Sequence, residues 1–209
     1  MRSLRVGRHA ILVVVDDPVS ASATRRLVLG LAADASRGLA TPVDVVPAAR
    51  TVLIDGLPGQ ADVEAWRSVL SDAVPPEGST TRGAEVTIEV GYDGADLAVV
   101  ARAWDCSPEA VVSRHQSAVF LVAFCGFAPG FAYCLPTSPL PVVPRRDEPR
   151  ERVPGGSVGL ADEYCGVYPS AMPGGWQLVG RTSAVLFDPG RAEPALLTPG
   201  ATVKFRAAP

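Results

Sequence analysis

Three glycine-rich segments hold the residue types that could bind a small molecule. They are residues 126–131 (GFAPGF), 153–159 (VPGGSVG) and 173–182 (PGGWQLVGRT), and each joins a predicted strand to a bend with an aromatic or hydroxyl side chain. Glycine lets a ligand approach the backbone closely, and successive unpaired N–H groups can hold an anion. The alternative interpretation is that a small β-barrel needs glycine and proline at its corners without any ligand.

Several common catalytic signatures are missing from the sequence. The patterns GxxxxGK[ST], GxGxxG and GxSxG do not occur, and Ser157 has no obvious His–Asp partners. The four cysteines form no CxxC pair and there are only two histidines, so we expect buried thiols rather than a zinc site. These observations disfavour a P-loop enzyme, a dinucleotide-binding enzyme, a serine hydrolase and a zinc enzyme.

Charged side chains are concentrated in residues 144–152 (PRRDEPRER), where seven of nine residues are charged. Arg145 and Arg146 could each bind a phosphate or a carboxylate through two hydrogen bonds, although most of this segment is interpreted as a solvated loop with mutual ion pairs. His115 ends a predicted helix, where the helix dipole favours a cation. A role for His115 as a general base is compatible with that position.

The composition is that of a folded protein without a membrane segment. Apolar residues make up 47% and charged residues 20% of the 209 residues, and the net charge is −3. The mean hydropathy is +0.21, but the longest apolar stretch, residues 118–128, is about half the length of a membrane-spanning helix. The N-terminus lacks the apolar core and cleavage site of a signal peptide. We therefore expect a cytoplasmic protein that binds neither membranes nor nucleic acid.

The first 83 residues predict a small α+β domain. Strands are expected at residues 10–15, 43–46 and 51–54, and helices at residues 20–36, with Ser20 or Ser22 as the N-cap, and 61–73. This β-α-β-β-α order suggests a ferredoxin-like unit with its helices on one face of a sheet. Residues 74–83 (VPPEGSTTRG) have the composition of a linker, so the predicted domains are 1–83 and 84–209.

Residues 84–209 predict a mainly β domain. Residues from Pro129 onward hold 13 of the 20 prolines, which disfavours helices and long strands. Helices are expected at residues 96–104 and 108–115, the latter with the start signal SPE. Strands are expected at residues 85–90, 119–124, 158–160, 176–180, 184–187 and 202–205.

The motifs GFAPGF, VPGGSVG, GVYP, PGGWQLVGRT and LFDP, in this order, resemble the allophanate hydrolase subunit 1 family. The resemblance runs from residues 90–97 (VGYDGADL) to Phe205, and more weakly over residues 7–13 and 46–53. It implies a ferredoxin-like α+β domain followed by a cyclophilin-like β-barrel. The chain departs from the family pattern at Arg8, at residues 132–136 (AYCLP) and at Glu148, and the last two changes lie beside the expected cleft.

That family includes the B subunit of the ATP-dependent 5-oxoprolinase. The resemblance therefore implies a hydrolase component, inactive alone, that acts with the C subunit, which is an allophanate hydrolase subunit 2-like protein, and with a LamB/YcsF-type A subunit. The complex would use ATP with Mg²⁺ to open the small amide substrate, 5-oxoproline, to glutamate, and we expect no tightly bound cofactor on this chain. The alternatives are a Kip-type inhibitor of a sensor histidine kinase and the carboxyltransferase half of a urea carboxylase-like system.

The implied site gathers the three glycine-rich segments at one cleft of the barrel. Phe127 and Phe131 would form an apolar wall, Arg146 and Arg181 would stabilise a developing phosphoryl group or carboxylate, and His115 would carry a proton. The alternative for Arg181 is a bracing ion pair with Asp188 or Asp162. No metal ligands are predicted. The N–H groups of residues 155–157 would surround an anion, and Gln177 would orient an amide. The predicted catalytic residues are His115, Arg146 and Arg181. The predicted substrate-binding residues are Phe127, Pro129, Phe131, Gly155, Gly156, Ser157, Gln177 and Thr182.

Overall fold

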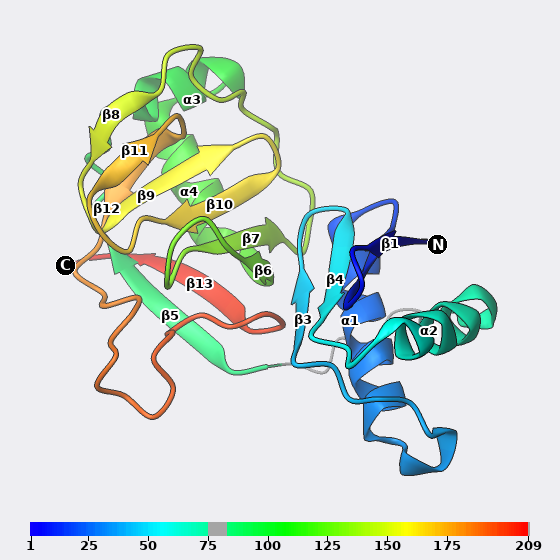
Figure 1. Ribbon diagram of the computed structural model, residues 1–209. Coiled ribbons are helices and arrows are strands. Elements are labelled where there is room, and N and C mark those ends of the chain that lie inside the picture. The colour runs from blue at the N-terminus through cyan, green and yellow to red at the C-terminus, as the bar shows by residue number, and fades with distance from the viewer. Residues whose placement is uncertain (75–82, 209) are drawn as a thin grey trace. The chain divides into compact units, whose positions relative to one another are not determined.

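A computed structural model describes residues 1–74 and 83–208, and the chain divides into two compact units, Met1–Thr81 and Arg82–Pro209 (Figure 1). Apart from Val74 and Gly83, the predicted linker at residues 74–83 lies outside the described residues. In these two ranges, no helix combines the length and apolar character needed to cross a membrane.

The first unit packs two helices against a four-stranded antiparallel sheet. Alternate residues of the central strands, among them Ile11, Val13 and Ile54, are buried with Val28 of the first helix and Trp66 of the second. The sheet order is β1-β2-β4-β3. Its elements are β1 (Arg2–Val6), β2 (Ala10–Val14), α1 (Pro18–Ala33), a 3₁₀ helix (Ala35–Arg37), β3 (Asp44–Pro47), β4 (Thr51–Asp55) and α2 (Gln60–Asp72).

Two features of this unit differ from the prediction. Strand β1 was not expected, because its sequence RSLRV is mostly exposed and has little apolar pattern. It pairs with β2 through a turn at Gly7, whose φ of 60° favours glycine. A ferredoxin-like unit has its last strand after the second helix, whereas here β1 at the N-terminus is the additional strand. The N-cap of α1 is Asp17, which accepts a hydrogen bond from the Ser20 N–H at 2.8 Å, rather than Ser20 or Ser22.

The described residues of the second unit form a mixed α/β fold around a nearly closed, barrel-like sheet. Seven strands follow the order β12-β9-β10-β7-β6-β13-β5, and all neighbours are antiparallel except β13 and β5. Gly91, just after β5, exchanges two backbone hydrogen bonds of 2.8 and 2.9 Å with Arg181 of β12. This bridge joins the two edge strands. The strands are β5 (Glu85–Val90), β6 (Val119–Cys125), β7 (Ala132–Pro136), β9 (Ser157–Ala161), β10 (Tyr164–Val167), β12 (Gln177–Arg181) and β13 (Thr202–Ala207).

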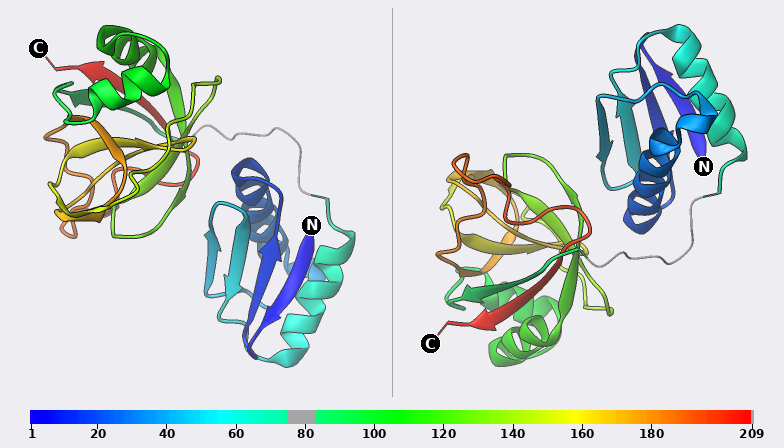
Figure 2. Two further views of the ribbon diagram at one scale, coloured as in Figure 1. Left: turned by 90° about the horizontal axis from the view of Figure 1, so that it is seen from above. Right: turned by 90° about the horizontal axis from the view of Figure 1, so that it is seen from below.

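Helices α3 (Leu97–Ala103) and α4 (Pro108–Ser117) lie together on one side of the barrel (Figure 2). Ser107 caps α4 as expected, since its hydroxyl accepts from the Ala110 N–H. A separate ribbon of β8 (Arg150–Val153) and β11 (Met172–Gly174) carries residues that matter for the site described below.

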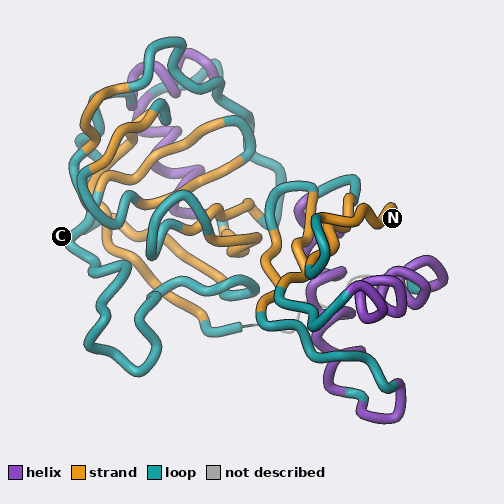
Figure 3. Tube along the Cα trace, in the orientation of Figure 1, coloured by secondary structure: helices purple, strands orange, loops and turns teal. Residues whose placement is uncertain are grey.

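The predicted strand at residues 184–187 is wrong. This segment lies in the long loop between β12 and β13 (Figure 3), and only Phe187 makes an isolated bridge, to Ala195. Conversely, β7, β8, β10 and β11 were not predicted. They are three to five residues long, and β11 reads MPG, so their local signal is weak. Pairing defines them, either with the preceding strand, as β6–β7 and β9–β10, or with a more distant one, as β7–β10 and β8–β11.

Candidate functional site

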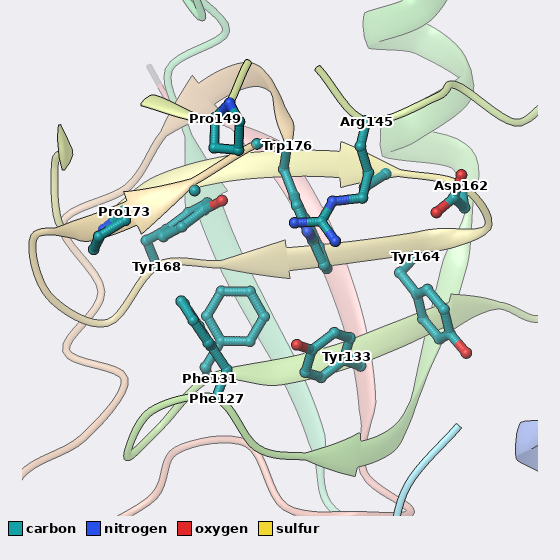
Figure 4. A pocket seen from close by; sticks show the side chains of 13 residues that line it. Phe127, Phe131, Tyr133, Arg145, Pro149, Asp162, Tyr164, Tyr168, Pro173 and Trp176 are labelled. Carbon is teal, nitrogen blue, oxygen red and sulfur yellow. The ribbon is translucent and has the colours of Figure 1, made fainter. Parts of the chain in front are cut away.

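An aromatic pocket of about 350 Å³ opens on the barrel (Figure 4). Phe127 and Phe131 come from the loop between β6 and β7, and Trp176 immediately precedes β12. Arg145 extends into the pocket from the loop that precedes β8 (Figure 4). We call this cavity the aromatic pocket. It is lined by Phe127, Phe131, Tyr133, Arg145, Pro149, Ala161, Asp162, Tyr164, Tyr168, Pro173, Gly174, Gly175 and Trp176.

The segment GFAPGF contributes two phenylalanines to this pocket, and their environments differ. Phe131 is buried and packs edge to face against Tyr168 and Trp176, with both ring-centroid distances at 5.3 Å. Phe127 is 65% exposed and has a φ of 72°, a left-handed backbone conformation that is rare for a bulky residue. Both phenylalanines therefore line this one pocket, with Phe127 at its solvent-facing edge, and their role in substrate binding stays a prediction.

Polar groups of the aromatic pocket can hold an anionic or carbonyl-bearing ligand. Arg145 is exposed and makes no ion pair within residues 1–74 and 83–208. Burial raises the pKa of the Tyr133 and Tyr168 phenols. The Arg145 guanidinium opposes part of that increase at Tyr133, and at Tyr168 the Trp176 backbone hydrogen bond opposes it more than Arg145 does. Burial, followed by the Glu163 carboxylate, also raises the pKa of Tyr164. All three phenols are therefore protonated at neutral pH, but Tyr164 already hydrogen-bonds to Glu163, which leaves Tyr133 and Tyr168 as donors beside the Arg145 guanidinium. The Asp162 carboxylate also lines the pocket.

A buried carboxylate fixes the frame around this pocket. Asp96 accepts two hydrogen bonds from the Arg150 guanidinium, at 2.8 and 2.9 Å, and one from the Leu178 N–H at 2.7 Å. The Arg146 guanidinium lies 3.5 Å away. Asp96 thus joins the start of α3 to β8 and β12. Pro149 directly precedes β8 and Trp176 directly precedes β12, and both residues line the aromatic pocket. Sequence reasoning missed this role because an aspartate before a helix usually caps it, whereas Asp96 makes no side-chain cap.

The structure separates Arg146 and Gln177 from the aromatic pocket. They line a neighbouring cavity of about 460 Å³, the Gln177 hollow, together with Val99, Pro144, Arg145, Asp147 and Glu148. Gln177 is buried and its Nε2 donates to the Pro144 carbonyl at 3.0 Å, while its Oε1 has no hydrogen-bond partner among the described residues. Arg145 lines both cavities and so connects them.

Arg181 and Ser157 line a third cavity of about 340 Å³, beside the Gly91–Arg181 bridge. We call it the seam hollow, and it is lined by Asp93, Gly94, Ala95, Arg150, Arg152, Pro154, Ser157, Leu178, Gly180 and Arg181. Arg181 forms an ion pair with Asp93 at 2.7 Å, so the pair considered as the alternative role of Arg181 exists, but its partner is neither Asp188 nor Asp162.

Residues 155–157 were predicted to hold an anion with three backbone N–H groups, but two of these groups already donate hydrogen bonds within the fold. The Gly156 N–H donates to the Tyr168 carbonyl and the Ser157 N–H to the Pro154 carbonyl. The one cleft expected from the sequence is thus three cavities. Four predicted residues, Pro129, Gly155, Gly156 and Thr182, line none of them.

His115 lies in the hydrophobic core and away from the three cavities. Its Nδ1 is 2.8 Å from the Tyr92 hydroxyl, its Nε2 is 3.3 Å from Cys165 Sγ, and its ring packs on Phe120 and Phe205. Burial lowers the pKa of His115 to about 3. It is therefore neutral at physiological pH, which also removes the cation expected at the end of α4, and the structure does not bring this proton carrier to the candidate site.

Cys134 and Cys165 are buried thiols, as expected, and burial raises the pKa of both. Among the residues that the structure describes, no cluster of three His, Cys, Asp or Glu side chains could hold a metal ion.

The comparisons with known proteins agree with the sequence motifs. A family model described as "Carboxyltransferase domain, subdomain C and D" matches residues 1–197. The chain is 36% identical to the B subunit of 5-oxoprolinase from Escherichia coli O157:H7, over 98% of the chain and 94% of that relative. It belongs to the 5-oxoprolinase B-subunit family. The resemblance to this family, which includes allophanate hydrolase subunit 1, is thereby confirmed.

Two solved structures share the fold of this family member. The crystal structure of TTHA0988 superposes with a TM-score of 0.77 at 30% identity, over 97% of the chain but only 40% of that longer protein. The urea amidolyase of K. lactis superposes with a TM-score of 0.75 over 99% of the chain and 15% of its own length. Since its identity is 20%, this second likeness concerns the fold alone.

Proposed function

We propose that the chain is the B subunit of an ATP-dependent 5-oxoprolinase and that it works with a C-type partner protein to convert 5-oxoproline to glutamate. The observation that carries this proposal is the 36% identity to the B subunit of the Escherichia coli 5-oxoprolinase, which extends along nearly the whole of both chains. The alternative of a urea carboxylase-like half is favoured by the carboxyltransferase family model over residues 1–197, but the urea amidolyase and urea carboxylase structures are only 20% and 19% identical and share the fold alone.

The aromatic pocket suits such a substrate in size and chemistry. Its volume of about 350 Å³ is at the lower end of the range for small-molecule sites, about 300–1,000 Å³. 5-Oxoproline is a flat five-membered lactam with one carboxylate. In the proposal, Arg145 binds the carboxylate through two hydrogen bonds, and Phe131 and Trp176 pack on the ring. The phenols of Tyr133 and Tyr168 then face the lactam oxygen as donors.

Because an amide is resonance-stabilised, the lactam carbonyl must be activated before water can attack it. ATP would transfer its terminal phosphoryl group to the lactam oxygen, with release of ADP, and water would then attack the activated carbon. Ring opening and loss of phosphate give glutamate, ADP and inorganic phosphate. Protonated phenols and a guanidinium stabilise negative charge that develops on the oxygen and the phosphoryl group. His115 has no part in this scheme, since it is buried and neutral.

The Gln177 hollow provides room for the phosphoryl donor in this proposal. It adjoins the aromatic pocket at Arg145, and Arg146 is its second cation. Since Arg146 also lies 3.5 Å from the buried Asp96, its guanidinium is held in place before any ligand arrives. A phosphate bound between Arg145 and Arg146 would be next to the substrate oxygen. Mg²⁺ would arrive with ATP.

The test is reconstitution with the neighbouring components of the complex. The chain is coexpressed with C-type and A-type partners, and glutamate release from 5-oxoproline is followed with and without ATP. We expect release only when ATP and all three proteins are present. An assembled complex that binds the chain but releases no glutamate would contradict the proposal. Recovery of a sensor kinase as the binding partner, with inhibition of its autophosphorylation, would favour the Kip-type alternative instead.

A further inference from the structure

We propose that the seam hollow is a binding site for a phosphate-type oxyanion, separate from the aromatic pocket. Three guanidinium groups line it, from Arg150, Arg152 and Arg181, against a single carboxylate from Asp93. Its volume is about 340 Å³, which is ample for a phosphate group. The inference is independent of the function proposed above.

The fold itself brings these cations together. Arg150 and Arg152 occupy alternate positions of β8, so their side chains leave the strand on the same side. Arg181 of β12 is directly opposite Ser157 of β9 in an antiparallel ladder, which places both side chains on one face. The Gly91–Arg181 bridge then brings the segment containing Asp93 to the rim.

The three arginines of the seam hollow differ in how far their charges are already paired with carboxylates. Arg150 is bound by Asp96 through two short hydrogen bonds, so its charge is compensated. Arg152 is exposed and makes no ion pair in the part of the chain that the structure describes. The Arg181–Asp93 pair has side chains that are 76% and 52% exposed, and a pair this exposed contributes little to stability. Arg152 and Arg181 are therefore available to an incoming anion.

The buried Ser157 hydroxyl is a further hydrogen-bond donor in the seam hollow, beside Arg152 and Arg181. Ser157 is only 6% exposed, and its hydroxyl can donate to an oxyanion held by the two arginines. Planar guanidinium groups match the oxygens of phosphate in pairs. None of the residues that line the seam hollow is aromatic, so nothing there stacks on a nucleobase. The site therefore suits a phosphate group, either free or at the end of a nucleotide.

The β8–β11 ribbon lies between this site and the aromatic pocket. Pro173 and Gly174 of β11 line the aromatic pocket, whereas Arg150 and Arg152 of β8 line the seam hollow. The bound oxyanion would thus contact the back of the ribbon that forms part of the pocket wall, rather than the small-molecule ligand itself.

The test is a titration of the full chain at low salt with inorganic phosphate, ATP and glutamate in separate experiments, followed by calorimetry and by backbone amide shifts. We expect phosphate to shift the amides near Arg152, Ser157 and Arg181. Arg152→Gln or Arg181→Gln should weaken phosphate binding about tenfold, since each removes a charge-assisted contact. Asp93→Asn should strengthen binding several-fold because it removes the competing carboxylate. The matched control, Arg114→Gln on α4, removes an exposed arginine elsewhere in the same unit.

The outcomes separate the possible sources of the phosphate group. Tighter binding of ATP with the same amide shifts would identify a nucleotide phosphate, and equal binding of both would identify free phosphate as sufficient. The proposal is overturned if phosphate does not bind, or if Arg114→Gln weakens binding as much as Arg152→Gln, since that indicates a diffuse surface attraction. Glutamate binding as tight as phosphate binding would overturn the assignment to phosphate.

Discussion

Replacing Asp96 with asparagine should destabilise the second unit more than almost any other change that preserves side-chain shape. The carboxylate is 4% exposed and holds Arg150, whose side chain is 22% exposed. The asparagine oxygen can still accept from the Leu178 N–H, which donates to Asp96 at 2.7 Å. The variant therefore isolates the loss of charge against Arg150 from the loss of the backbone contact.

The magnitude follows from the geometry of the pair. Removing one partner of a buried ion pair costs about 3–5 kcal/mol, because the other charge stays uncompensated. Arg150 retains some access to water, so we expect the lower end, about 3 kcal/mol, which corresponds to a decrease of about 10 °C in Tm for a unit of this size. In the double variant Asp96→Asn/Arg150→Gln neither charge is left unpaired, so its loss should be smaller than the sum of the two single losses by about 2 kcal/mol.

Urea unfolding followed by tryptophan fluorescence measures these values. The chain has three tryptophans, and Trp66 belongs to the first unit, so all variants carry Trp66→Phe and the signal comes from Trp104 and Trp176. A loss below about 1 kcal/mol for Asp96→Asn, or strict additivity in the double variant, would refute the view that this carboxylate compensates a buried charge.

Four further predictions concern single residues. Arg145→Gln should lower kcat/KM for glutamate release roughly tenfold to a hundredfold in the assembled complex without changing Tm, because Arg145 is exposed and has no ion pair among the described residues. Below pH 6.5 the unfolded chain protonates His115 whereas the folded chain does so only near pH 3; stability should therefore fall by about 1.4 kcal/mol per pH unit across that window in urea titrations, and His115→Phe should remove this slope. Arg181→Ala should leave both Tm and glutamate release near wild type, and a tenfold loss of activity would place Arg181 in the reaction. Gly156→Ala should lower Tm strongly in thermal unfolding, because φ is 81° and the added Cβ would collide with the Thr182 carbonyl; an unchanged Tm would contradict the described turn.

The sequence predicted the elements whose signal is local. Strands β2, β5, β6 and β13 are apolar or alternating runs, and α4 has its own cap and start signal. Strand β10 was missed because its sequence YCGV has little strand signal, and it exists because β7 and β9 pair with it on both sides. Residues 184–187 show the opposite case, since an apolar run finds no strand partner. Pairing between distant segments is not visible in one sequence.

The candidate site was predicted in part for the same reason. The motif GFAPGF grouped Phe127 and Phe131, and both line the aromatic pocket. Tyr133 and Tyr164 were missed because they meet only through the β7–β10 pairing, which brings their rings to 5.6 Å. Aromatic residues about 30 positions apart give no periodic signal.

Consecutive residues explain why the single predicted cleft became several cavities. Trp176 lines the aromatic pocket whereas Gln177, the next residue, lines the Gln177 hollow. Successive side chains of an extended segment point to opposite faces, so a short motif rich in functional groups is divided between two sides of the chain. A motif in the sequence therefore predicts the region in which a site lies better than it predicts which residues line that site.

The division also assigns stability and ligand binding to different residues. Asp96 and its partners Arg150 and Leu178 are held in short, buried contacts between regular elements. Arg145 and Phe127 are exposed on loops and contribute few fixed contacts. Charge that is compensated in a buried pair, as at Arg150, stabilises the fold and attracts a ligand only weakly. Charge that is exposed and, among the described residues, unpaired, as at Arg145, costs little at the surface and remains free to bind. Substitutions in the first group should therefore lower Tm and activity together, whereas substitutions in the second should lower activity at constant Tm.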